Sequence, residues 1–285
     1  MYMASLGLLG LLGLLGFLFT PMAQAHGGLA NYTVGDPPVW YRGYDPDENA
    51  AEQDGQPWMV QRKWASIDPI FSVADPFLAC NKPGTPGPAY IPVAAGQNLT
   101  AVYWYWLHPV GPMSAWLAAC PPLDEGGCVG VDVNALRWFK IWEAGLLAGT
   151  GNLAEGIWYQ KQFQRWDGSP DLWPVTIPAS LQAGLYVVRH EIVSIHIANR
   201  PQFYPECAHL NVTGGGTELP PTSFYKTFPG AYSVDDPSLN IDIYSDAMRN
   251  TYVRFGPEAR LSEGMLEETL TTQNYTIPGG PVWTG

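Results

Sequence analysis

The chain has 285 residues and a formal net charge of −12, because 26 Asp and Glu residues outnumber 14 Lys and Arg residues. Such a charge repels nucleic acids and anionic lipid surfaces, so we expect neither a nucleic acid nor a membrane as a partner. Glycine (31 residues) and proline (27 residues) are abundant without a collagen-like period, which favours short strands joined by many turns.

The N-terminal segment 1–25 has the pattern of a secretory signal peptide. Leu, Gly and Phe alone make up residues 6–19, a run too short and too rich in glycine to span a membrane, and Ala23-Gln24-Ala25 fits a cleavage site. We therefore expect a secreted, extracellular protein whose mature chain begins at His26. The amine and the ring of a terminal histidine can chelate one metal ion; alternatively, His26 only marks where the leader happens to end.

The first clear strand signal in the mature chain lies at residues 99–108, which are predicted to form one strand. Its alternation places Val102, Trp104, Trp106 and His108 on one face. The opposite face is also apolar, which is typical of a strand in the centre of a sandwich.

Further strands are expected at residues 138–142, 173–178, 185–198 and 209–212, and the third of these is expected to be the longest. Residues 246–270 break the pattern and are predicted to be an inserted loop or a short helix. We predict an all-β fold, a single antiparallel β-sandwich of immunoglobulin-like or fibronectin-like type with long loops. It would form one domain over residues 26–285, with no carbohydrate-binding module.

The cysteines and the glycosylation sequons fit an extracellular protein. Four cysteines are an even number, so two disulfides are expected in an oxidising compartment, and three pairings are open: the residues are Cys80, Cys120, Cys128 and Cys207. Four Asn-x-Thr triplets are candidates for N-linked glycans: they begin at Asn31, Asn98, Asn211 and Asn274.

Among the five histidines, His108 is the strongest candidate partner for His26. It ends its predicted strand beside Pro109-Val110-Gly111-Pro112, at a sheet rim, where surface histidines are more common than ligands. A chelate at His26 still needs a third nitrogen, however, and three nitrogens with open positions favour Cu(II). His190 is interpreted as a packed strand residue, and His209 as structural or exposed.

Several segments occur in an order that can be compared with known families. They are His26 after the leader, His108 before a Gly-Pro, Trp138-Phe139-Lys140-Ile141, residues 184–196, Gln202-Phe203-Tyr204-Pro205-Glu206-Cys207, Phe228-Pro229-Gly230-Ala231-Tyr232 and residues 275–281. Together they resemble the fungal lytic polysaccharide monooxygenases of auxiliary activity family nine, formerly glycoside hydrolase family sixty-one. The resemblance runs from His26 to about Tyr244 and resumes at Tyr275.

The resemblance implies roles for individual residues. His26 and His108 match the histidine brace that binds copper, and Tyr204 matches the tyrosine on the axial side of the metal. His196 and Gln202, with Tyr204, match the catalytic residues around it. The resemblance also implies disulfides between Cys80 and Cys207 and between Cys120 and Cys128.

The resemblance further implies the chemistry and the partners. The expected activity is oxidative cleavage of β-1,4-glucan, most of all cellulose, by hydrogen abstraction at C1 or C4. It uses one copper ion that cycles between Cu(II) and Cu(I), O2 or H2O2 as co-substrate, and an external electron donor. The enzyme is expected to act as a monomer. The loop aromatics Tyr41, Tyr44 and Tyr275 are candidate substrate-binding residues on a flat face around His26.

Two rival functions stay open at this point. A glycoside hydrolase would need two carboxylates flanking the scissile bond, and the sequence shows no paired signature. A non-catalytic copper-binding or polysaccharide-binding protein on the same fold is the other alternative. The presence of His196, Gln202 and Tyr204 speaks against it. It stays open because the stretch from His196 to Gln202 is shorter than expected for the family, which puts the placement of Gln202 in doubt.

Overall fold

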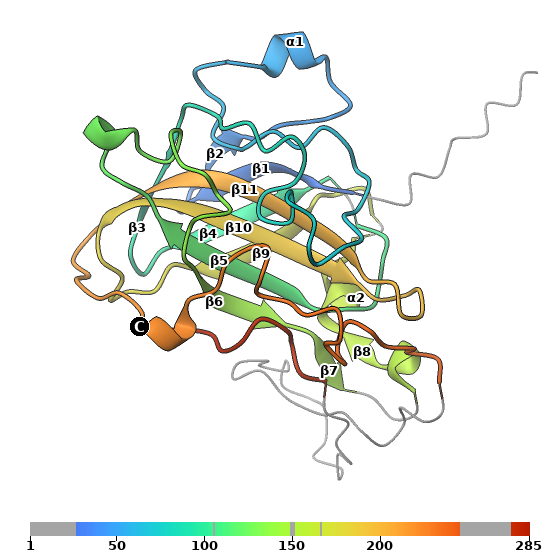
Figure 1. Cartoon of the computed structure of the whole chain (residues 1–285). Coiled ribbons are helices and arrows are strands. Elements are labelled where there is room, and N and C mark those ends of the chain that lie inside the picture. The colour runs from blue at the N-terminus through green and yellow to red at the C-terminus, as the bar shows by residue number, and fades with distance from the viewer. Residues whose placement is uncertain (1–26, 105, 149–151, 166, 246–274) are drawn as a thin grey trace, which may run out of the picture.

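Two β-sheets lie face to face in the computed structural model, which describes residues 27–104, 106–148, 152–165, 167–245 and 275–285 (Figure 1). The smaller sheet has four strands in the order β2-β1-β4-β9, and all of its pairs are antiparallel. Its strands are β1 (Leu29–Val34), β2 (Val39–Arg42), β4 (Asn98–Tyr103) and β9 (Asp171–Thr176).

The larger sheet has five strands in the order β3-β11-β10-β5-β6. Its strands are β3 (Ile91–Ala94), β5 (Met113–Ala119), β6 (Trp138–Ala144), β10 (Gly184–Ser194) and β11 (Gln202–Thr213). The expected β-sandwich is therefore confirmed, with one addition: β3 pairs with β11 in the parallel direction.

Short elements complete the described part of the chain. Two short helices are α1 (Ala50–Gln53) and α2 (Tyr159–Phe163), and β7 (Leu146–Ala148) pairs with β8 (Ile157–Trp158). Single 3-10 turns are η1 (Leu123–Glu125), η2 (Leu153–Glu155) and η3 (Thr222–Phe224). No helix in the described ranges is long and apolar enough to cross a membrane. The expected leader 1–25 and the segment 246–270 lie outside these ranges.

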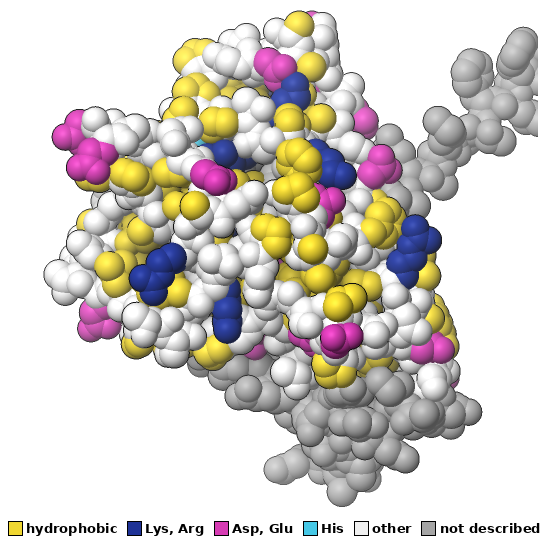
Figure 2. Space-filling model, viewed as in Figure 1, with side chains coloured by type: hydrophobic (Ala, Val, Ile, Leu, Met, Phe, Trp, Pro, Cys, Tyr) yellow, Lys and Arg dark blue, Asp and Glu magenta, His cyan; other side chains and the backbone are white. Residues whose placement is uncertain are grey.

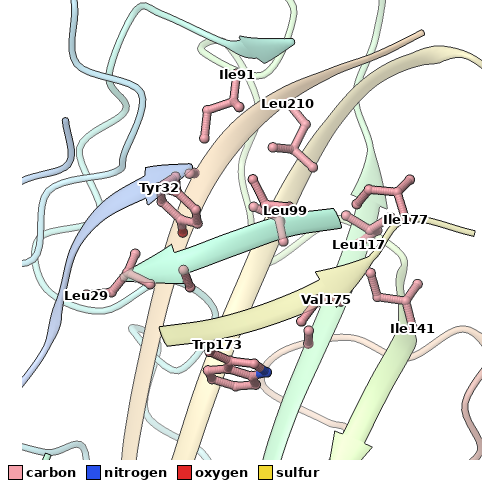
Figure 3. Close-up of a cluster of buried hydrophobic side chains, with 14 of the residues drawn as sticks. Leu29, Tyr32, Ile91, Leu99, Leu117, Ile141, Trp173, Val175, Ile177 and Leu210 are labelled. Carbon is pink, nitrogen blue, oxygen red and sulfur yellow. The ribbon is translucent and has the colours of Figure 1, made fainter. Parts of the chain in front are cut away.

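The main core fills the space between the two sheets. Every second residue of β9 is buried, as expected for a strand with one face on a core. In Figure 3, side chains of the smaller sheet, among them Tyr32, Leu99 and Val175, point toward Leu117 and Leu210 of the larger sheet. Pro174 fits in β9 because this strand lies at the edge of its sheet.

A second core covers the outer face of the five-stranded sheet. Long loops bring Leu78, Phe228 and Tyr232 over Val187 and Val193 of β10. Because both faces of β10 are covered, its charged residues are buried as well. Arg189 and Glu191 form an ion pair with each other, with 2.8 Å between Arg189 Nη1 and Glu191 Oε2.

Three of the expected strand limits are wrong. The strand predicted at 99–108 ends at Tyr103, and the strand predicted at 185–198 ends at Ser194. The strand predicted at 209–212 begins already at Gln202 and is longer than β10. Residues 138–142 and 173–178 do lie mainly in strands, β6 and β9.

Both disulfide pairings implied by the resemblance are present in the structure. Cys80 is bonded to Cys207 over a separation of 127 residues, and Cys120 is bonded to Cys128. The first bond joins a covering loop to the middle of β11. It therefore holds the second core on the sheet.

Two histidines outside the site are completely buried. His190 lies between the rings of Tyr32 and Trp173 in the main core, and neither of its ring nitrogens has a hydrogen-bond partner among the described residues. Burial lowers the pKa of His190 to about 3. His209 is also buried rather than exposed, and burial lowers its pKa to about 3 as well.

We predict that replacing His190 by Phe makes the protein less sensitive to acid. Between pH 6.5 and 3, the unfolded chain binds a proton at His190 that the folded chain does not bind, so its contribution to stability falls as the pH falls. Relative to the wild type, H190F should gain up to about 1.4 kcal/mol in free energy of unfolding per pH unit below 6. Urea unfolding at pH 7, 5.5 and 4 measures this, and a difference that stays constant across these values would contradict it.

Candidate functional site

His108 lies beyond the end of β4, in a segment that returns the chain to β5. Its side chain is buried, and its ring stacks on the ring of His196, with 4.3 Å between the ring centroids and 13° between the planes. Trp106 packs edge-on against His108 at 5.4 Å, and its Nε1 donates to Gln160 Oε1 at 3.0 Å. The imidazole of His108 is therefore held by packing on both sides.

The connection between β10 and β11 brings the next two site residues to the same place. Ser194 pairs with Gln202 at the end of the two strands, and His196 lies in the connection between them. Ser194 Oγ lies 2.6 Å from Nδ1 of His196, and the hydroxyl of Tyr244 donates to the His196 carbonyl at 3.0 Å. The short loop therefore keeps Gln202 beside the two histidines.

Tyr204 connects the members of this cluster. Its hydroxyl donates to Gln202 Oε1 at 2.8 Å and lies 3.3 Å from Nε2 of His108. Its ring contacts Trp106 edge-on at 4.8 Å. Burial, with a smaller effect from the nearby carboxyl of Glu206, raises the pKa of Tyr204, so the phenol stays protonated at neutral pH.

The first described residues of the chain enter the fold beside the same segment. The carbonyl of Gly28 accepts a hydrogen bond from the Trp104 backbone N–H at 3.2 Å, and Leu29 pairs with Tyr103. No side chain fits at Gly28, because a Cβ atom would lie 2.0 Å from the ring of Trp64. His26 itself lies outside the described residues, two positions before Gly28.

The donors around His108 suit a transition metal. An imidazole nitrogen with a protonated phenol nearby fits a copper site better than a calcium or magnesium site, which needs several oxygen ligands. Among the described residues, no group of three or more His, Cys, Asp or Glu side chains is placed to hold a metal ion. The donors of His26 fall outside that search.

The three candidate substrate-binding tyrosines do not form an exposed face. Tyr44 is only 3% exposed and packs against Met59 and Trp64, and Tyr275 is 2% exposed and packs against Trp158. The expectation of an exposed face is wrong for both, because their rings are buried against other side chains of the protein. Tyr41 is partly buried against the main core.

Tyr244 is a site residue that was not predicted from the sequence. It is 56% exposed, and its hydroxyl donates a hydrogen bond to the backbone carbonyl of His196. The alternation of Ile241, Asp242 and Ile243 could have indicated its exposure. Both isoleucines are buried, so the positions that alternate with them, Asp242 and Tyr244, point the other way.

The face of the molecule in Figure 2 shows acidic and basic side chains dispersed among hydrophobic ones.

Comparisons with known proteins give a consistent result. A family model described as Auxiliary Activity family 9 (formerly GH61) matches residues 26–252. AA9 family lytic polysaccharide monooxygenase B of Heterobasidion irregulare is 39% identical over 271 residues, which cover 94% of this chain and 96% of the relative. The AA9 family lytic polysaccharide monooxygenase-like protein CEL1 of Agaricus bisporus is 38% identical over 270 residues, which cover 93% of this chain and 73% of the relative.

Solved structures agree with this. The crystal structure of HiLPMO9B has 37% sequence identity and a TM-score of 0.73, with 91% of this chain and 100% of that chain covered. A cellulose-active polysaccharide monooxygenase from M. thermophila has 31% identity and a TM-score of 0.74, with the same coverage.

We predict that replacing Tyr204 by Phe destabilises the fold by about 1–3 kcal/mol, because it leaves the buried Oε1 of Gln202 without this donor. The double variant Y204F/Q202M removes both partners and should recover part of the loss. Chemical denaturation of the wild type, both single variants and the double variant measures the coupling. Additive losses would show that the hydrogen bond contributes nothing.

Proposed function

Because the chain belongs to auxiliary activity family 9, the lytic polysaccharide monooxygenases, we propose that it cleaves β-1,4-glucan by copper-dependent oxidation at C1 or C4. Family membership makes it an oxidoreductase that degrades polysaccharides; the metal, the glucan and the oxidised carbon are our proposal. One observation carries it: His108, His196, Gln202 and Tyr204 form a single buried or half-buried cluster, and the segment that leads to His108 bonds to the start of the described chain through Trp104 and Gly28.

Copper would be held by three nitrogens and a phenol. The amine and ring of His26 and the ring of His108 would be the nitrogen ligands, and the phenol of Tyr204 would be the further donor. The family match begins at residue 26, which supports cleavage of the leader after Ala25. A copper ion in such a site supplies one-electron redox chemistry toward O2 or H2O2.

The proposed role of Tyr204 is to shield one side of the metal site and to orient the ligands, not to react itself. Its buried, protonated hydroxyl lies 3.3 Å from Nε2 of His108 and would exclude water and a further ligand from that side of a metal held there. The hydrogen bond to Gln202 fixes the direction of this hydroxyl. Supporting contacts of this kind orient the ligands of a metal site.

His196 and Gln202 are the groups placed to bind an oxygen co-substrate. The contact between Ser194 Oγ and Nδ1 sets the orientation of the His196 ring, and stacking on His108 sets its position. A histidine held in this way can hold a proton and donate a hydrogen bond at a fixed point. The amide of Gln202 offers a second donor beside it.

The relatives and the leader support the proposed substrate and location. A solved relative is named as cellulose-active, which supports cellulose or a related β-glucan as the polymer. The enzyme would work outside the cell after removal of residues 1–25, as a monomer that takes electrons from an external donor.

The mature protein with copper and ascorbate is expected to release oligosaccharides with oxidised ends from amorphous cellulose. Products should disappear without the reductant and in the His108→Ala variant. His190→Phe, which replaces another buried histidine in the main core, should keep them and serves as the matched control. Product analysis by mass spectrometry decides the outcome: unoxidised ends would indicate a hydrolase, and copper binding without any products would indicate a binding protein.

We predict that one extra residue ahead of His26 removes most of the copper affinity, because the chelate then loses its terminal amine. The loss should exceed the roughly 10- to 100-fold change that supporting residues produce. Calorimetric titration of mature and extended protein with copper measures it. Near-equal affinities would contradict the assignment of His26, whatever the activity of the two forms.

A further inference from the structure

Two of the four sequons lie on the same face of the same sheet. Asn31 and Thr33 belong to β1, and Asn98 and Thr100 belong to β4, the strand beside it. The middle residues of these triplets, Tyr32 and Leu99, point into the main core in Figure 3. Because side chains alternate along a strand, the Asn and Thr residues point away from the core.

The register shows which residues share this outer face. One row across the four strands contains Trp40, Thr33, Thr100 and Pro174. In the next row, Asn31 stands beside Arg42, Val102 and Leu172. Apolar side chains on the two edge strands of this face are open to solvent, with Trp40 57% and Leu172 44% exposed.

The Asn98 side chain is placed for modification. It is exposed at the start of β4, and its Oδ1 accepts a hydrogen bond from Thr176 Oγ1 at 2.7 Å. That bond fixes the amide plane and uses the oxygen, whereas an N-linked glycan is attached to Nδ2. Asn31 is partly exposed on the same face.

We propose that N-linked glycans on Asn31 and Asn98 cover the outer face of the four-stranded sheet, with the first sugar on Asn31 packed against Trp40. In each transfer, Nδ2 forms a bond to C1 of an N-acetylhexosamine, the bond from C1 to a pyrophosphate-linked lipid carrier breaks, and Nδ2 loses a proton. The lipid-linked oligosaccharide is the glycan donor of the secretory pathway, so the proposal rests on secretion and is independent of copper.

The geometry explains why Trp40 is the contact. Asn31 faces Arg42 across the β1–β2 pair, so Trp40 is its diagonal neighbour, at about 7–8 Å. A sugar attached to Asn31 reaches this distance, and the apolar face of a hexose stacks on an aromatic ring. The glycan would also cover part of β2, an edge strand that exposes both Val39 and Trp40. Exposed apolar edge strands are sites of aggregation unless they are blocked.

Site-resolved mass spectrometry of the protein secreted by a fungal or yeast host tests the assignment directly. Peptides containing Asn31 and Asn98 should both carry a glycan, and an unmodified peptide at either position would overturn the proposal. Asn31→Gln and Asn98→Gln should each lose one glycan. Thr33→Ser and Thr100→Ser, which keep the sequons, should retain both and serve as matched controls.

The contact with Trp40 has its own readout. Enzymatic removal of the glycans from the folded protein should raise modification of Trp40 by a soluble tryptophan reagent about twofold, because a stacked sugar covers one of the two ring faces. The N31Q variant should show the raised level without treatment, and N98Q should stay closer to the wild type. Equal Trp40 reactivity in glycosylated and deglycosylated protein would overturn the packing of the sugar on this ring.

Discussion

A buried guanidinium holds the covering loops of this enzyme on its larger sheet. Arg189 is completely buried, so its charge is tolerated only where its donors are matched. The guanidinium of Arg189 donates hydrogen bonds to the carboxylate of Glu191 and to backbone carbonyls of the 78–80 turn. The residue opposite Arg189 in β11 is Cys207, whose disulfide reaches the same turn. One turn is thus tied to two neighbouring strands, and those strands continue to the site.

The strand content of the fold could be predicted from the sequence, whereas the strand ends could not. Alternation continues from β4 through Trp106 and His108, although the ladder stops at Tyr103, because an extended loop shows the same pattern as a strand. Pro205 argues against a strand at the start of β11. The proline is accommodated because the edge of β11 that faces β3 is unpaired with that strand before Leu210. The missing backbone N–H of Pro205 therefore breaks no hydrogen bond to β3.

The order of motifs was enough to assemble the site cluster, but not to describe the surface around it. The motifs predict His108, His196, Gln202 and Tyr204 as site residues, and the structure brings these four side chains together. Exposure is a different matter, because it depends on how the long loops fold. Nothing local in the sequence distinguishes the buried Tyr44 from an exposed aromatic in a similar loop. His26 stays a prediction, since its amine exists only after cleavage.

The turn between β10 and β11 can change in length, whereas the register of the two strands must stay fixed for the site to form. Register pairs Ser194 with Gln202, and this pairing sets which face carries Tyr204. Residues gained or lost between Ile197 and Arg200 leave this pairing in place, although they would disturb the backbone hydrogen bond from Asn199 to Ile241. A single residue gained in β11 between Gln202 and Tyr204 would instead place these two side chains on opposite faces. The pairing of Ser194 with Gln202 is therefore the constraint on Tyr204, and the length of the connection between the two strands is not.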